Sequence, residues 1–566
     1  MTRTVGPQRA ASPEQPLTLV EVARLLRTGR TSSVELTRAA LTRADDCREL
    51  GTFVTRFDDD ALARAERADR DFQAGVDHGL LQGIPVGVKD LLAAAEGPTT
   101  ANSVVLDRSW GQGRDAPVVG RLKRAGAVVV GKTTTFEFAA GLPEEGRQFP
   151  IPRNAWDSGR SPGGSSSGAG NGVASGQFLA AIGTDSVGSI RIPAAWNGIS
   201  GLKPTFGLVP TSGCVPLGYS FDHVGPLARS ARDCAAVLRA ITGPDDGDPG
   251  NPPGPPDGDG LSALLQGRDA DLRGLRVGVD RHPRFTGPDA DPDLETRFVA
   301  ALGALEALGA RIVDISLPWY DAASAALLVM LSGEALAYHR GDLQSRWQDY
   351  LSTTRVSFAR GALASAADYV QASRVRRLVQ RELAGVFGGV DVVVTPTVSI
   401  PAPTIEEMQQ GGIDRLYASI FTGYWNLTGS PVLAVPMGFA AAGLPLSFQI
   451  AGRPFEDATV LRVGDAYQQA TDWHLRIPSQ DRKSIGQAGS TPPDLQPVPV
   501  QPGAADALAG QLIAAAGIVP EADETAALAA SYPLLKASIE SLYAIPEARY
   551  ETPSLSFDAA PGRADW

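Results

Sequence analysis

The stretch RSPGGSSSGAGNGVASGQFLAAIGTDSVGSIRIP, residues Arg160 to Pro193, stands out in this chain of 566 residues. Its many glycine and serine residues allow unusual backbone angles and close approach of a ligand, at an entropic cost on folding. A flexible linker has a similar composition. However, the stretch lies among apolar segments, and Asp185 and Arg191 would be odd choices in a linker. We therefore interpret it as part of a functional site.

A serine in this stretch needs a base, because an unassisted hydroxyl is a poor nucleophile at neutral pH. None of the five histidines lies in the stretch, so a Ser-His-Asp triad would have to recruit His223 or His282. We interpret His223 as a structural residue. Lysine is an alternative base when burial keeps it neutral. Lys89 ends the apolar segment GIPVGVKD; standing alone, it would be interpreted as a solvated lysine that closes a strand.

Predicted strands and helices alternate around Lys89. Residues 84–88 have the alternation of a strand, residues 117–125 form a predicted helix, and AVVVGK (127–132) is a predicted buried strand. The overlapping GAVVVGKT (126–133) has the spelling of a phosphate-binding loop, but such a loop must follow the strand, whereas AVVV is the strand itself. The pattern predicts a layered α/β protein and argues against nucleotide binding.

The alternation extends along the rest of the chain. We predict helices over 17–71, with Thr31, Ser32 and Ser33 as candidate caps, a strand over 275–279, a helix over 294–308, strands over 310–315 and 391–397, and a turn followed by a strand over 426–438. Residues 243–258 are rich in proline, glycine and aspartate, which predicts an exposed loop.

The last part of the chain has a different composition. We predict a catalytic domain over 1–480, a proline-rich linker over 481–502 and a helical C-terminal extension over 503–566. In this extension Leu508, Leu512, Leu535, Ile539 and Leu542 mark two amphipathic helices, and Pro546 ends the second. Two short helices bury too little surface to be stable alone, so the extension should pack on another element.

The overall composition excludes several classes of function. The formal net charge of −12 disfavours nucleic acid or an anionic membrane as a partner. Three cysteines without a CxxC spacing suggest neither a disulfide framework nor a zinc site. No apolar run has the length of a signal peptide or a membrane span. We expect a cytoplasmic protein that acts on a small molecule without a metal or cofactor, and a homodimer is compatible with the sequence.

Four segments resemble the amidase signature family: GIPVGVKD (83–90), PGGSSSG (162–168), GTDSVGSIRIPAAWNGISGLKPTFGLVP (183–210) and SFDHVGPLARS (220–230). That family has a Ser-cisSer-Lys triad. The resemblance assigns the base to Lys89, the relay to Ser165 and the nucleophile to Ser189. The family's spacing of 24 residues between its two serines is also met.

The resemblance implies a three-layer fold with a central mixed β-sheet flanked by helices, to which the C-terminal helices are added. It implies a cis peptide bond at Ser165 and an acyl-enzyme intermediate on Ser189. Backbone amides of Ser186, Val187, Gly188 and Ser189 would form the oxyanion hole. Asp185 and Arg191 flank this turn and would brace it as an ion pair. The remaining alternative for these two residues is a pair of separately solvated charges.

The sequence departs from the family pattern in the turn and in the pocket. Val187 replaces a glycine, so a positive φ at this position would be strained. Thr134 and Thr135 replace the usual Asn and Met, and Ser167 also replaces a glycine. The candidate substrate-binding residues are Thr135, Phe136, Gly164, Phe421 and Tyr424. For the aromatic residues near 421–425, core packing is an equally good interpretation.

The family acts on fatty amides, aryl amides, ureido compounds and carbamates, and includes a glutaminase subunit of amidotransferases. Residues 417–426 contain no acid that would hold the amine of glutamine. We expect a stand-alone amidase or urethanase; a catalytically silent scaffold and an amidotransferase subunit remain alternatives. The tail, which includes YPLLKASIESLYAIPEARYE, resembles a small helical partner subunit fused in cis, with Glu547, Arg549 and Tyr550 as an extended strap.

Overall fold

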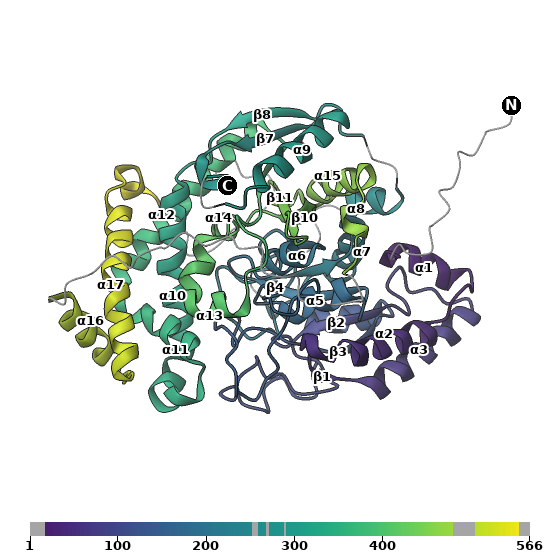
Figure 1. Ribbon diagram of the computed structural model, residues 1–566, viewed down its shortest axis with the longest axis horizontal. Coiled ribbons are helices and arrows are strands. Elements are labelled where there is room, and N and C mark those ends of the chain that lie inside the picture. Colours follow the sequence, from purple (N-terminus) through teal and green to yellow (C-terminus); the bar gives the residue numbers. More distant parts are fainter. Residues whose placement is uncertain are drawn as a thin grey trace.

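The computed structural model describes residues 17–248, 250–251, 258–267, 271–287, 290–478 and 504–553. Within these residues a mixed sheet of 11 strands forms the centre of the molecule (Figure 1). The strands are β1 (Phe53–Arg56), β2 (Pro85–Lys89), β3 (Val128–Thr133), β4 (Ala180–Asp185), β5 (Ser200–Lys203), β6 (His223–Ala228), β7 (Arg276–Asp280), β8 (Arg311–Ile315), β9 (Val392–Pro396), β10 (Val432–Phe439) and β11 (Pro445–Gly452).

Helices cover both faces of the sheet. They are α1 (Leu19–Arg27), α2 (Ser33–Asp46), α3 (Asp58–Gln73), α4 (Pro117–Arg124), α5 (Ser167–Ser175), α6 (Arg191–Asn197), α7 (Ala231–Ile241), α8 (Gly258–Leu265), α9 (Leu294–Ala307), α10 (Tyr320–Ser345), α11 (Ser352–Ala359), α12 (Ala366–Gly389), α13 (Ile405–Ala418), α14 (Gly423–Thr428), α15 (Asp457–Ala470), α16 (Ala504–Ala515) and α17 (Ala522–Tyr543). Short 3₁₀ turns lie at Arg48–Leu50, Pro283–Phe285, Trp347–Asp349, Arg360–Leu363, Trp473–Leu475 and Pro546–Tyr550.

Strand β3 shows how the two faces divide. Val129 packs into the cluster formed with α1, α4, α7, α9 and α15, whereas Val128 and Val130 pack against α3, α5 and α6. Neighbouring side chains on a strand point to opposite faces, so a continuous apolar run such as AVVV serves both layers. This confirms the predicted three-layer α/β fold. It also confirms that residues 128–133 form a strand, which excludes the phosphate-binding loop that their spelling suggested.

The strand order is β1-β3-β2-β4-β6-β5-β10-β11-β9-β7-β8. Strand β2 pairs in parallel with both β3 and β4, and β4 pairs antiparallel with β6. The carboxyl ends of parallel strands meet at one edge of a sheet. Lys89 ends β2 and Asp185 ends β4, so the segments that follow both strands meet at the same edge.

Most of the predicted elements are present, with local corrections. Strand β1 interrupts the helical region predicted over 17–71, and Ser32 caps α2 through a capping box with Glu35. Asn426 belongs to the short helix α14 and not to a turn, because Gly429, at φ +79°, ends that helix one turn later. The predicted loop over 243–258 is described only in part, since residues 249 and 252–257 lie outside the described residues.

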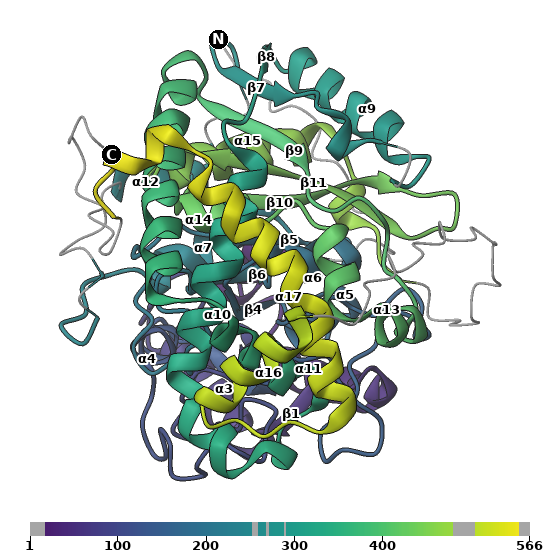
Figure 2. The ribbon, with the colours of Figure 1, turned by 90° about the vertical axis from the view of Figure 1, so that its left-hand side faces the viewer.

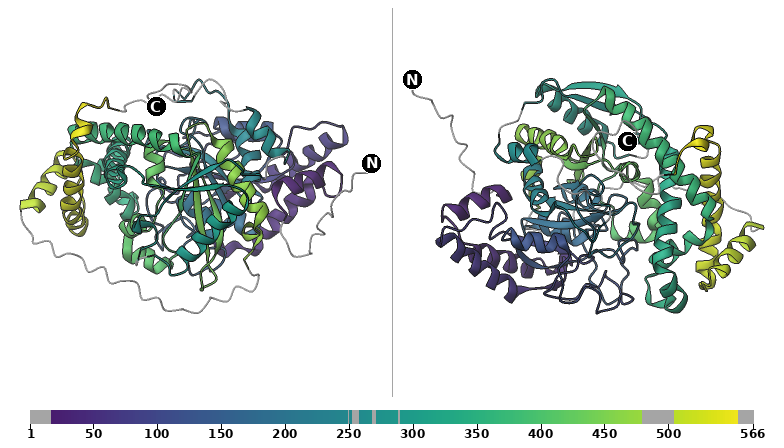
Figure 3. Two further views of the ribbon diagram at one scale, coloured as in Figure 1. Left: turned by 90° about the horizontal axis from the view of Figure 1, so that it is seen from above. Right: turned by 180° about the vertical axis from the view of Figure 1, so that it is seen from behind.

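The C-terminal extension packs on the same chain. Figure 2 shows α17 lying across α10, and Figure 3 shows α16 and α17 at the end of the molecule opposite α1–α3. Leu528, Leu535 and Leu542 of α17 belong to the core cluster that includes α10 and α12. Beside them, the carboxylate of Glu524 accepts hydrogen bonds from Arg355 (2.5 Å) and Trp347 (2.7 Å).

Two expectations for the tail change. Pro546–Tyr550, which contains Glu547 and Arg549, forms a 3₁₀ turn, so the extended strap predicted there is wrong for these residues. Helix α17 already ends at Tyr543, before Pro546. The predicted linker over 481–502 lies outside the described residues.

Helix α10 is long. Among the described residues it is the one helix whose length and mean hydropathy of 1.2 would suffice to cross a membrane. Half of that apolar stretch is buried inside the protein, and α12 and α17 pack against it. Core helices pass the same test, and these contacts are those of a core helix.

Candidate active site

Lys89 lies at the end of β2 with its side chain buried. Its Nζ atom lies 2.7 Å from Ser165 Oγ, 2.8 Å from Thr184 Oγ1 and 3.0 Å from Ser166 Oγ. Because burial disfavours the charged form, the pKa of Lys89 falls from 10.5 to about 7. A large fraction of this lysine is therefore neutral at neutral pH. The interpretation as a solvated lysine is excluded.

Ser165 lies in the glycine- and serine-rich stretch immediately before α5. The Gly164–Ser165 peptide bond is cis, as the family resemblance implied. The Ser165 carbonyl accepts a hydrogen bond of 3.2 Å from the Phe136 amide. A Cβ atom on Gly164 would approach the Phe136 ring to 2.2 Å, so only glycine fits there. Of the predicted substrate-binding residues, Gly164 and Phe136 thus lie beside Ser165.

Ser189 lies in the turn between β4 and α6. Its side chain is half-buried, and its carbonyl accepts a hydrogen bond of 3.1 Å from the Ser166 amide. The hydroxyl of Ser189 forms no hydrogen bond with any residue that the structure describes. Since catalytic hydrogen bonds in ligand-free enzymes are often long, this geometry is compatible with a nucleophile that aligns when a substrate binds.

The positive φ that the turn requires falls on Gly188, at +138°, and not on Val187. The substitution of Val187 for the usual glycine is therefore not strained in the way the sequence suggested. Thr422 Oγ1 donates to the Val187 carbonyl, which fixes the turn from the side of α14. The amides of Val187, Gly188 and Ser189 donate to no other group among the described residues. These N–H groups are free for a ligand.

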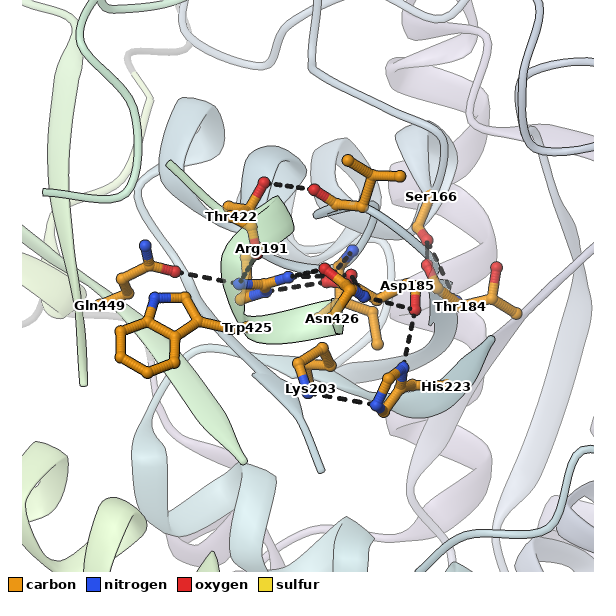
Figure 4. A network of polar contacts seen from close by, with 12 residues as sticks. Ser166, Thr184, Asp185, Arg191, Lys203, His223, Thr422, Trp425, Asn426 and Gln449 are labelled. Atoms are coloured by element: carbon orange, nitrogen blue, oxygen red, sulfur yellow. Dashed lines mark hydrogen bonds and ion pairs between the residues drawn. The ribbon is translucent and has the colours of Figure 1, made fainter. Parts of the chain in front are cut away.

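Asp185 and Arg191 form the ion pair predicted from the sequence, and Figure 4 shows them at the centre of a polar network. Arg191 Nε and Nη2 donate to the two Asp185 carboxylate oxygens, both at 3.0 Å. Burial alone would raise the pKa of Asp185, but the adjacent Arg191 guanidinium outweighs burial and holds this pKa well below its usual range. The pair is therefore ionised and not solvated.

Arg191 is also tied to the second half of the chain. Its guanidinium donates to Asn426 Oδ1 at 2.6 Å, to the Thr422 carbonyl at 3.0 Å and to Gln449 Oε1 at 3.1 Å (Figure 4). Buried charges are stable only when such partners saturate their hydrogen-bonding capacity. None of these three partners was identified from the sequence, because side-chain partners more than 230 residues away leave no local pattern.

His223 has the structural position that the sequence suggested. Its Nδ1 lies 2.6 Å from the Phe221 carbonyl, and its Nε2 lies 3.2 Å from Nζ of the buried Lys203 (Figure 4). Burial holds the pKa of His223 well below its usual value, so the ring is neutral. A hydrogen bond to a backbone carbonyl requires the proton on Nδ1, which leaves Nε2 as the acceptor from Lys203.

Asp222 is a site residue that sequence reasoning missed. Its carboxylate accepts hydrogen bonds from Ser186 Oγ at 2.5 Å and from the Leu217 amide at 2.9 Å. Burial raises the pKa of Asp222 to about 6. Because Ser186 begins the turn that carries Ser189, Asp222 fixes one end of this turn. The only sequence signal was its place in SFDHVGP, beside His223.

The predicted aromatic surface is core packing. Phe421 and Tyr424 are buried, and the Tyr424 ring stacks on Tyr320 with centroids 5.3 Å apart. The Tyr424 hydroxyl donates to the Pro318 carbonyl at 3.1 Å, so it is already occupied. Thr135 is buried, and its amide donates to Asn102 Oδ1. Within the described part of the chain, no group of His, Cys, Asp or Glu side chains is arranged to hold a metal ion.

Comparison with known proteins agrees with this geometry. A family model described as Amidase matches residues 35–461. A glutamyl-tRNA(Gln) amidotransferase protein of Chloroflexus aggregans is 37% identical over 491 residues, which cover 82% of this chain and 99% of that protein. An amidase of Pseudomonas putida is 38% identical over 470 residues, covering 82% and 97%. The native peptide amidase of Stenotrophomonas maltophilia superimposes with a TM-score of 0.71 at 30% identity, covering 83% and 99%.

Proposed function

The chain belongs to the amidase family, and we propose that it hydrolyses a carbon–nitrogen bond of a small amide or carbamate with Ser189 as the nucleophile. One observation carries the proposal. A buried lysine whose pKa lies near neutrality is hydrogen-bonded to Ser165, in the loop that also contacts the backbone of Ser189. Perturbed bases beside a serine are typical of nucleophilic catalysis.

The proposed proton path runs from Ser189 through Ser165 to Lys89. Neutral Lys89 accepts the proton of Ser165, Ser165 accepts the proton of Ser189, and Ser189 Oγ forms a bond to the substrate carbonyl carbon. The proton then returns through Ser165 to the leaving nitrogen as the carbon–nitrogen bond breaks. Water hydrolyses the resulting acyl-enzyme by the same path and restores the Ser189 hydroxyl.

The tetrahedral intermediate places a negative charge on the former carbonyl oxygen. We assign its stabilisation to the turn amides of Val187, Gly188 and Ser189, which have no other acceptor among the described residues. Loss of one such donor typically costs about 2.7–4 kcal/mol of transition-state stabilisation. The buried Asp185–Arg191 pair holds the base of the turn, because Asp185 Oδ2 also accepts from the Ile190 amide at 3.2 Å.

An activity-based probe tests the proposal directly. A fluorophosphonate should attach to Ser189 in the wild-type protein, and mass spectrometry of the digested protein should locate it there. Ser189→Ala should abolish labelling and turnover while the melting temperature stays unchanged. Ser538→Ala, an exposed serine of α17, is the matched control and should keep both. A folded wild-type sample that is not labelled would refute the serine-hydrolase mechanism.

The relatives support a second candidate, an amidotransferase subunit that releases ammonia from glutamine. The Chloroflexus aggregans relative is named as part of such an amidotransferase. The absence of an acidic residue over 417–426 counts against glutamine as the substrate. Ammonia release by the purified chain should therefore be faster from simple amides than from glutamine. Efficient turnover of glutamine only in the presence of partner subunits would favour the second candidate.

A further inference from the structure

A cavity of about 570 Å³ opens beside α10, within the range that is typical of small-molecule sites. It is lined by residues 104–108 and Trp110, by Phe138, and by Tyr338, His339, Asp342 and Arg346 of α10. The floor is buried, since Phe138 and His339 are each 1% exposed, whereas Asp107 and Arg108 are exposed at the rim. The proposed catalytic residues do not line it.

One wall of this cavity is continuous with the catalytic centre. Phe136 donates its amide proton to the Ser165 carbonyl, and Phe138, two residues later, lines the cavity. Two residues of extended chain span at most about 7 Å. Ala101, Asn102, Phe138 and Ala139 all have φ between +46° and +64°, and the Phe138 amide donates to the Ala101 carbonyl. Non-glycine residues rarely adopt these angles except at functional sites.

A second wall also leads to the catalytic turn. The ring of Tyr338 in the cavity contacts the ring of Tyr219, with centroids 6.4 Å apart. Tyr219 lies on the loop whose Asp222 binds Ser186. Two separate segments thus connect the cavity to the proposed site, one through Ser165 and the other through Ser186.

The lining favours a neutral aromatic ligand. Phe138, Tyr338, His339 and Trp110 offer rings, and burial lowers the pKa of His339 to about 3, so that ring is uncharged. His339 Nδ1 lies 3.0 Å from the Tyr350 hydroxyl, and its Nε2 has no hydrogen-bond partner among the described residues. Nε2 is therefore the one ring atom of His339 left for a polar atom of a ligand.

The charges at the rim do not select an ion. The Arg346 guanidinium is occupied, because it donates to the Val104 and Val105 carbonyls and forms an ion pair with Asp349. Asp107 accepts from the amide and hydroxyl of Ser109. Acidic and basic side chains are mixed around the opening, so neither a cation nor an anion has a clear preference.

We propose that this cavity receives a neutral aromatic group of the substrate that Ser189 attacks. The inference rests on the proposed hydrolase function and narrows its substrates to amides or carbamates that bear an aryl ring. Stacked and edge-on aromatic contacts contribute about 0.5–1.5 kcal/mol each beyond their buried area. An aryl substrate should therefore bind more tightly than its methyl counterpart.

Equilibrium binding separates this inference from the catalytic proposal. Phenylacetamide and acetamide are titrated by calorimetry into Ser189→Ala, which cannot turn them over if the mechanism is right. Adding Tyr338→Ala should weaken phenylacetamide binding about three- to tenfold, the equivalent of one aromatic contact. Val104→Trp should also weaken it by filling the rim. Tyr543→Ala, which removes a half-exposed tyrosine of α17, is the matched control and should bind like its parent.

The outcomes are distinct. Phenylacetamide that binds no more tightly than acetamide, or whose affinity is the same in the Tyr338→Ala and Val104→Trp variants, overturns the inference. Selective binding that both variants weaken supports it, even in a protein whose Ser189 takes no fluorophosphonate. In that last case the catalytic proposal fails and the aryl site stands.

Discussion

Nζ of Lys89 lies 2.7 Å from Oγ of Ser165, although 76 residues separate them in the chain. Parallel pairing of β2 with β4 brings the end of β2 to the edge of the sheet where the serine-rich loop lies. The lysine side chain is buried in passing from one to the other. This burial is what makes a lysine, normally protonated at neutral pH, suitable as a base.

The depressed pKa of Lys89 predicts the pH profile of activity. Because its pKa is about 7, the neutral, active form increases as pH rises through 7 and dominates above about 8. The kcat/KM for amide hydrolysis should therefore increase about tenfold from pH 6 to pH 8 and then level off. Lys89→Ala should lower this plateau strongly and remove the titration near 7. Lys536→Ala, an exposed lysine of α17, should keep the wild-type profile. Full activity of Lys89→Ala at neutral pH would mean that another group is the base.

The hydrogen bond between Ser186 and Asp222 should matter for kcat more than for KM. Hydrogen bonds to charged groups are worth about 1.5–3 kcal/mol, so Asp222→Asn should reduce kcat by about tenfold or more. Ser186→Ala should act through the same contact, and the double variant should lose little more than either single one. Steady-state kinetics with melting curves checks this. Asp314→Asn, at an exposed ion pair, is the control. Strictly additive losses would show that the two residues act independently.

Gly188 should tolerate no side chain. Its φ is +138°, and a Cβ atom there would lie 2.2 Å from Thr422 Oγ1. Gly188→Ala should displace the turn amides and lower kcat by about 10²–10³, the usual cost of one oxyanion donor. Gly303→Ala in α9 is the matched control, because an added Cβ meets nothing within 4 Å. Wild-type turnover by Gly188→Ala would show that the turn does not present the oxyanion donors.

The packing of the C-terminal extension can be tested with two leucines of α17. Leu528 is fully buried against the helical layer, whereas Leu534 is 76% exposed on the same helix. Leu528→Ala should lower the free energy of unfolding of this region by about 2–5 kcal/mol. Leu534→Ala should change it by less than about 0.5 kcal/mol. Limited proteolysis of the extension, followed over denaturant concentration, measures both. Equal protease resistance of the two variants would contradict packing of α17 on the same chain.

Much of the fold was readable from local pattern. The runs that end at Lys89 and Thr133 have the apolar continuity of strands buried on both faces, and such patterns depend only on neighbouring residues. The same holds for the C-terminal helices. The short strand β1 and helix α14 were missed because four- and six-residue elements give too few positions for a period to appear.

The sequence by itself determined the chemistry on offer: the serines at 165 and 189, a lysine ending an apolar strand, and Asp185 and Arg191 close enough in sequence to pair. Tertiary structure alone decided which side chains complete the site. Asp222, Thr422 and Asn426 reach the catalytic turn from distant elements, because contacts across a sheet depend on strand order and register and leave no local signature. It likewise moved Phe421 and Tyr424 into the core and opened the aromatic cavity beside Phe138, since burial is set by the elements that pack around a residue.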